Sequence, residues 1–125
     1  FLGYEFRPQY RYPRKKSMQK LRDSIRERTL RTSGQCLKAI IQSITPVLRG
    51  WFEYYKHSHY TVFEDVDGWV RMRLRSILRK RAKRQGPGRG WDHLRWPNAF
   101  FAKHGLFSLE AAHVLVQSAL RKANH

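Results

Sequence analysis

Residues 67–84 read DGWVRMRLRSILRKRAKR and join an apolar helical face to an unopposed row of cations. Counting Val66 just before this stretch, the apolar side chains recur every three or four positions, as on one side of an α-helix. They are Val66, Trp69, Val70, Leu74 and Ile77. This spacing predicts a helix over residues 63–84, roughly 33 Å long at a rise of about 1.5 Å per residue. Thr61 and Glu64 have the spacing of a capping box at its start.

The cations of this helix form a stripe opposite its apolar face. The stripe consists of Arg71, Arg75, Arg79 and Lys83, with Arg73, Lys80 and Arg84 on its flanks. No acid stands between Gly68 and Trp91 to neutralise them. Guanidinium groups hold phosphate oxygens in pairs, so an exposed stripe of this kind predicts contact with a nucleic-acid backbone. A solvated surface is the alternative interpretation.

The composition favours a polyanionic partner. Among 125 residues, 26 Lys and Arg stand against 9 Asp and Glu, which gives a formal charge of +17, while 41% hydrophobic residues allow a packed core. Nucleic acid is the first candidate partner and an anionic membrane the second. The sequence has no apolar run of about 18 residues that would span a membrane. The single cysteine excludes an internal disulfide framework and a paired-cysteine zinc module.

A second basic block lies near the N-terminus, where residues 1–31 carry ten cations and three acids. Its candidate nucleic-acid contacts are Arg14, Lys15, Lys16 and Lys20, beside Arg11 and Arg22, with Arg49 as a further candidate. Asp23 and Glu27 lie close enough in sequence to neutralise part of this block.

The remaining patterns predict a mainly α fold, a helical bundle with a short N-terminal strand or hairpin over residues 1–12. One helix is expected from a Ser17 cap to Gly34, a second through Leu37 and Ile44, and a third starting at Thr45 and Pro46. After a Gly-rich break at residues 85–90, we expect a short helix between Pro97 and Gly105 and a last helix capped by Ser108. Trp51 and Trp69 fall on apolar faces and are predicted to be core residues.

No catalytic constellation is visible. Asp65 and Asp67 are two positions apart, which places them on different sides of a helix, and His93 follows Asp92 without the rest of a nuclease site. No cofactor, metal site or phosphate-binding glycine loop is expected. A metal-dependent nuclease built on Asp65, Asp67 and His93 is kept as the less favoured enzymatic hypothesis.

Several segments together resemble group II intron reverse transcriptases. FLGYEF at residues 1–6 resembles the end of their palm, and PVLRGWFEYYKHS at residues 46–58 with residues 67–84 resembles their maturase-specific region, also called domain X or the thumb. WPNAFFAKHGLFSLEAAH at residues 96–113 is similar to the C-terminus of many bacterial members. The resemblance implies a palm end at 1–12, a thumb-like helical domain at 13–85, and a Gly-rich break with a basic helical segment at 86–125.

The resemblance also implies a function. Such a domain binds structured intron RNA, assists splicing and helps the palm and fingers of the parent protein to grip a template–primer duplex. The Tyr-Ala-Asp-Asp motif of the polymerase is absent and the first residue is Phe, so we expect a non-enzymatic piece of a longer protein. The expected location is the bacterial cytoplasm, on nucleic acid and not on a membrane. A generic basic DNA- or RNA-binding architectural protein is the alternative.

Overall fold

The computed structural model describes residues 4–7, 10–82 and 89–123, and the side chains of residues 11–82 and 92–123. An antiparallel hairpin of β1 (Tyr4–Arg7) and β2 (Tyr10–Pro13) opens the chain. Three long helices follow, α1 (Lys15–Arg28), α2 (Leu37–Tyr55) and α3 (Tyr60–Arg81). Three more helices complete it, α4 (Arg89–Arg95), α5 (Asn98–Lys103) and α6 (Leu109–Ala123). The predicted mainly α bundle with an N-terminal hairpin is confirmed.

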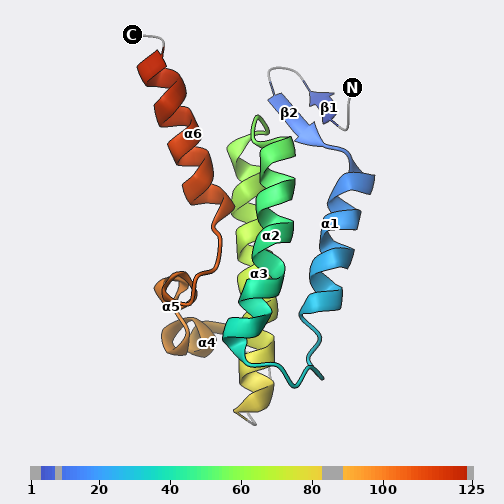
Figure 1. The fold of residues 1–125 in the computed structure, drawn as a ribbon, viewed down its shortest axis with the longest axis vertical. Helices are drawn as coiled ribbons and strands as arrows, with labels where there is room; N and C mark the ends of the chain where they lie inside the picture. Colours follow the sequence, from blue (N-terminus) through green and yellow to red (C-terminus); the bar gives the residue numbers. More distant parts are fainter. Residues whose placement is uncertain (1–3, 8–9, 83–88, 124–125) are drawn as a thin grey trace.

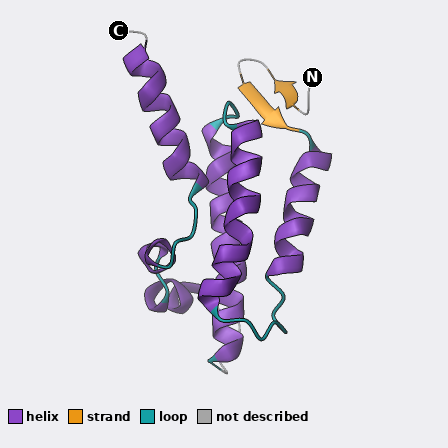
Figure 2. Ribbon diagram, viewed as in Figure 1, coloured by secondary structure: helices purple, strands orange, loops and turns teal. Residues whose placement is uncertain are grey.

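The long helices form a bundle, with α2 in front of α3 and α1 beside them (Figure 1). The hairpin lies at one end of the bundle and α4 and α5 lie toward the other (Figure 2). One core receives fully buried side chains from five helices, among them Ile25, Ile44, Leu74, Phe101 and Leu109, each 0% exposed. Burial of a large apolar side chain stabilises the fold by about 1.5–3 kcal/mol, so this shared core holds the C-terminal helices as well as the bundle.

The expected helix start at Thr45 and Pro46 is wrong, because α2 runs unbroken from Leu37 to Tyr55 with Pro46 inside it. Proline removes one helical hydrogen bond and disfavours the preceding turn by about 3 kcal/mol. Burial opposes this cost, since Ile41, Ile44 and Leu48 on both sides of Pro46 form one buried stripe. The apolar spacing therefore continues in register across Pro46 and keeps one helix.

Three predicted caps or ends also differ from the structure. The first helix begins at Lys15, and the Ser17 hydroxyl accepts a hydrogen bond from Tyr55 Oη at 2.7 Å instead of capping it. It ends at Arg28 and not at Gly34, because the Thr29 main chain leaves the helical conformation there. The third long helix begins one residue before Thr61, with His59 at its N-cap and no side-chain cap hydrogen bond.

The C-terminal helix boundaries are largely as predicted. The short helix α5 has Pro97 at its N-cap, and Gly105 beyond its end has φ of 88°, a left-handed conformation that favours glycine. Ser108 precedes α6 and its Oγ accepts a hydrogen bond from Ala111 N at 3.1 Å. The helix α4 was not predicted, and it covers residues 89–90 of the expected Gly-rich break. The rest of that break lies outside the described residues.

Candidate nucleic-acid interface

The arginines of α3 divide between two neighbouring elements, so the predicted exposed stripe is wrong in part. Arg75 is only 5% exposed. Its Nε donates to Trp96 O at 2.9 Å, its Nη2 donates to Asn98 Oδ1 at 2.9 Å, and its guanidinium lies 5.2 Å from the Phe101 ring centre. The position that a helical wheel places toward solvent is thus covered by the start of α5, and Arg75 holds that helix to α3.

Burial has an electrostatic effect on this arginine. The pKa of Arg75 is lowered chiefly by burial and then by the neighbouring charge of Arg71, while the Asp92 carboxylate raises it. An arginine still remains protonated in a protein. Its buried charge therefore requires the carbonyl, amide and aromatic contacts that the α4–α5 segment supplies.

Asp67 binds the first turn of α6 from α3. This residue is 4% exposed, and its carboxylate accepts hydrogen bonds from Ser108 Oγ at 2.9 Å, Leu109 N at 3.0 Å and Glu110 N at 3.0 Å. The first N–H groups of a helix have no partner within the helix, and a negative charge is favoured at that end. Asp67 therefore acts as a cap supplied by another helix, a role that its own sequence neighbourhood does not indicate.

The other side of α3 contacts the end of α1. Arg73 donates from Nε to Thr29 Oγ1 at 2.8 Å and from Nη2 to Thr29 O at 3.1 Å. The guanidinium groups of Arg22, Arg26 and Arg73 lie 5.8, 5.4 and 5.6 Å from the Trp69 ring centre. The pKa of Arg73 is lowered by burial first and by the charge of Arg26 second. Three cations thus gather around one partly buried indole, where an anionic ligand would relieve their mutual repulsion.

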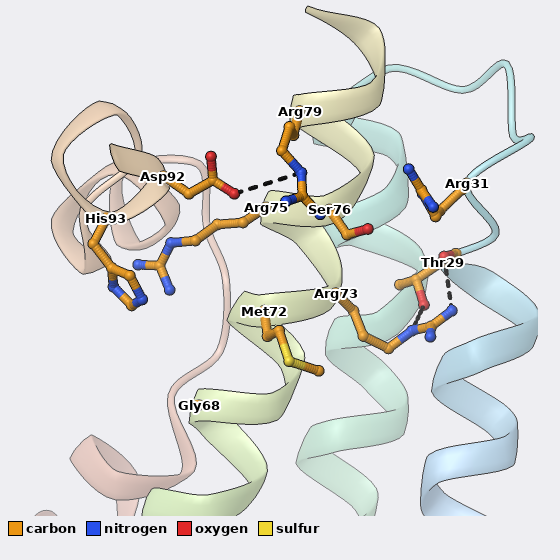
Figure 3. A pocket seen from close by; sticks show the side chains of 10 residues that line it. All are labelled: Thr29, Arg31, Gly68, Met72, Arg73, Arg75, Ser76, Arg79, Asp92 and His93. Carbon is orange, nitrogen blue, oxygen red and sulfur yellow. Dashed lines mark hydrogen bonds and ion pairs between the residues drawn. The ribbon is translucent and has the colours of Figure 1, made fainter. Parts of the chain in front are cut away.

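A pocket of about 540 Å³ lies on α3 between these two sides. Figure 3 shows its lining, with Gly68, Met72 and Ser76 along α3 and residues of α4 on the opposite side from the end of α1. We call it the arginine pocket, and its lining is Thr29, Arg31, Gly68, Met72, Arg73, Arg75, Ser76, Arg79, Asp92 and His93. Four arginines face a single carboxylate there, so the pocket is electropositive.

The other predicted contact residues are not gathered into this pocket. On α3, Arg71 is partly exposed and Lys80 is exposed. Arg14, Lys15, Lys16 and Lys20 are exposed along the first turns of α1, toward the hairpin end of the bundle. Arg49 is exposed on α2, with its guanidinium 5.1 Å from the Phe107 ring centre. Lys83 and Arg84 lie outside the described residues.

Two arginines in or near the pocket were not identified from the sequence. Arg31, in the loop after α1, lines the pocket and is exposed. Arg81 donates from Nη2 to Ser33 O at 3.1 Å and also to Gln35 O, which ties the α1–α2 loop to the end of α3. Only the charge density of the sequence could have drawn attention to either residue, because their positions depend on the path of that loop.

The predicted core tryptophans pack as expected. Trp51 and Trp69 are partly buried against the hydrophobic core, and Trp96 packs there too. The side chain of Trp91 is outside the described part of the chain. Tyr54 is 57% exposed on α2, with its ring centre 4.7 Å from that of Tyr55.

The nuclease hypothesis finds no support in the geometry. The oxygens of Asp67 are engaged by α6, while Asp65 is exposed on α3 and His93 lies in the arginine pocket. Within residues 4–7, 10–82 and 89–123, no group of three or more His, Cys, Asp or Glu side chains is arranged to hold a metal ion.

None of the helices described here combines the length and apolar character needed to cross a membrane. A comparison with curated proteins finds no matching sequence. A comparison with protein-family models matches residues 18–96 to the maturase-specific domain of group II introns. This match runs from Met18 in α1 through α2, α3 and the arginine pocket and covers more than half of the chain, so the chain belongs to the group II intron maturase-specific domain family.

Proposed function

We propose that this chain binds the structured RNA of a group II intron, mainly through phosphates, and thereby assists splicing without a catalytic site of its own. The arginine pocket carries this proposal. Besides the buried Arg75, its lining includes Arg31, Arg73 and Arg79 around a cavity of about 540 Å³, on a protein with a formal charge of +17. Neutralising phosphates with such cations releases counterions and supplies most of the affinity for RNA.

The bound strand would follow the outer face of α3. Arg31 is exposed beside the pocket, and the Nη1 group of Arg73 makes no hydrogen bond to the described residues. Arg71 and Lys80 extend the cationic surface along α3. Phosphate contacts of this kind fix the position of the protein on RNA, whereas base contacts supply sequence preference.

The same surface would also meet a template–primer duplex when the palm and fingers of a parent reverse transcriptase hold one. This second part of the proposal follows from the family and from the exposed cations of α1 and α3. Under this proposal the protein acts on nucleic acid in the cell and needs no cofactor.

The test is a salt titration of RNA affinity. Filter binding of a group II intron RNA over a range of salt should give a slope of log K against log salt of about −4 to −5, for about six neutralised phosphates. A random DNA duplex of equal length serves as the control. A slope near zero would contradict the proposal, and equal affinity for the DNA duplex would favour a generic architectural protein.

A further inference from the structure

The arginine pocket contains one buried acid whose oxygens have few partners. Asp92, on α4, is 8% exposed. Among the described side chains its nearest cation is Arg79, with Nε 3.8 Å from Asp92 Oδ2, which is beyond hydrogen-bond distance. No other described side chain donates a hydrogen bond to this carboxylate, although an ionised carboxylate has about four acceptor sites. The Asp92 side chain is still 11% exposed, so water reaches its oxygens, and a ligand with paired donors can replace that water.

The pocket offers different chemistry at its two sides. Arg31 and Arg73, toward α1, can hold an anion, whereas Asp92 faces the cavity from α4 (Figure 3). Met72 lies between them on α3 and is 57% exposed, so the face of a flat aromatic ring could rest against its thioether. The volume of about 540 Å³ falls within the range of about 300–1,000 Å³ for sites that hold small molecules.

The geometry points to a site for one unstacked guanine nucleotide of RNA, with its phosphate on Arg31 and Arg73 and its Watson–Crick edge on Asp92. This inference rests on the proposed function and names a base that the bound RNA presents to the pocket. Proteins recognise RNA sequence mostly at such unstacked bases, through hydrogen bonds to their edges.

Guanine fits Asp92 better than the other bases because of its donors. Its N1–H and N2 amino groups are adjacent and can donate to the two carboxylate oxygens together, and its O6 accepts beside them from an arginine N–H such as that of Arg79. Adenine and cytosine present one donor group on that edge, next to an acceptor, and uracil presents a single N–H between two acceptors. A paired contact of this type discriminates against a wrong base by about 1–3 kcal/mol.

The experiment measures the binding of the 125-residue chain to a fluorescent 11-nucleotide oligouridylate whose central base is G, inosine, A, C or U. We expect the G oligonucleotide to bind about tenfold more tightly than the A, C and U ones. Inosine lacks the N2 amino group, so its affinity should fall between those of G and A. This base series uses only the unmodified chain, so its result does not depend on whether a variant folds.

Two variants assign the preference to its residue. Asp92→Asn should reduce the preference for G to within about twofold, while affinity for the all-U strand stays the same or rises because a negative charge is lost. Asp65→Asn is the matched control, since Asp65 is exposed on α3 outside the pocket, and it should keep the full preference.

The outcomes separate the two proposals. RNA binding with no preference for G, or with a preference for cytosine, would overturn the guanine site and leave the proposed function standing. A preference for G that survives in Asp92→Asn would also overturn it. Failure to bind any RNA at low salt would instead contradict the proposed function.

Discussion

Asp67 Oδ2 lies 2.9 Å from Ser108 Oγ, so a carboxylate in the middle of α3 fixes the position where α6 begins. Ser108 has two roles there, because its Oγ donates to Asp67 and accepts from Ala111 N. With the Arg75 contacts to Trp96 and Asn98, this pair attaches the segment after α3 to the bundle at two separate points.

Replacing Asp67 should destabilise the fold. Asp67→Ala removes the acceptor for three hydrogen bonds at the start of α6, and each bond to a charged group contributes about 1.5–3 kcal/mol. We expect the free energy of unfolding to fall by about 2–4 kcal/mol in urea denaturation, allowing for water that reaches the opened site. Asp65→Ala, at an exposed position of the same helix, should change it by less than about 0.5 kcal/mol. Equal effects of the two substitutions would contradict the capping role.

Arg75 should behave as a structural residue and not as an RNA contact. Arg75→Lys keeps the charge but replaces the planar fork, whose Nε and Nη2 reach Trp96 O and Asn98 Oδ1, by one shorter ammonium group, so we expect a loss of about 2–3 kcal/mol in stability. Measured well below its melting temperature, this variant should keep the salt slope of the unmodified chain. A shallower slope in a fully folded Arg75→Lys sample would show that Arg75 contacts phosphate after all.

Arg71 and Lys80, which are at least partly exposed on α3, should contribute to RNA binding and not to stability. Arg71→Gln with Lys80→Gln removes two cations that are at least partly exposed. Stability should stay within about 0.5 kcal/mol per substitution, since surface changes rarely do more. The slope of log K against log salt should become shallower by about one to two, with similar weakening for all RNA ligands. Unchanged binding would move the RNA surface to Arg14, Lys15, Lys16 and Lys20, and selective loss of intron RNA would mean that these side chains read its shape.

Stability should decrease on mild acidification through His113 of α6. Burial lowers the pKa of His113 below its ordinary value of 6.5, and the charges of His57 and His59 lower it further. The ring packs on Phe63 at 4.8 Å between ring centres, and its Nε2 lies 3.3 Å from Gln117 Nε2. The unfolded chain therefore binds a proton at higher pH than the folded one. The stability that the neutral His113 ring contributes is complete above the pKa of the unfolded chain. It is lost as pH falls through the lower pKa of the folded chain.

Urea midpoints at pH 7.5 and pH 5.0 measure this effect, and the difference between them should be smaller for His113→Gln than for the unmodified chain. An equal difference in both proteins would assign the acid sensitivity to other groups.

Pro46→Ala should stabilise the protein. Alanine restores the N–H that α2 lacks at this position, and proline in a helix interior is about 3 kcal/mol less favourable than alanine. The greater freedom of the unfolded alanine chain offsets part of this gain, by about 0.4–1 kcal/mol. A net increase of about 2–2.6 kcal/mol in the free energy of unfolding is expected in urea. A decrease would mean that Pro46 makes a contact within the native fold that alanine cannot replace.

Periodicity predicted the core of this protein well. The apolar positions of residues 63–84 gave the buried face of α3, because they depend only on the helical repeat, and the same holds for Leu21 and Ile25 of α1. The helix break expected at Pro46 was wrong because too much weight was given to a single proline. The apolar stripe through Ile41, Ile44 and Leu48 was already continuous in the sequence, and its burial opposes the helix-breaking cost of one proline.

The functional surface was harder to predict, since a helical wheel shows which residues face away from the core but not what folds over them. Arg71 and Arg75 look equivalent on the wheel of α3. They differ because the chain turns back after α3 and brings Asn98 and Phe101 into contact with the Arg75 guanidinium. The role of Asp67 depends on the same return of the chain, which brings residues 41 or more positions later in sequence to its carboxylate.

The residues that match the family model end before the residues that complete the packed core. The family match stops at residue 96. Asn98, which accepts a hydrogen bond from Arg75, comes after it, as do the fully buried core residues Phe101 and Leu109, and Leu109 N donates to Asp67. A chain cut at residue 96 would lose the two fully buried apolar side chains Phe101 and Leu109 and leave the Asp67 carboxylate without its donors. Such a truncated protein should aggregate on expression, whereas one that ends after α6 should remain monodisperse in gel filtration. We therefore expect the smallest unit that can be produced and transplanted between proteins to be longer than the residues that match the family model.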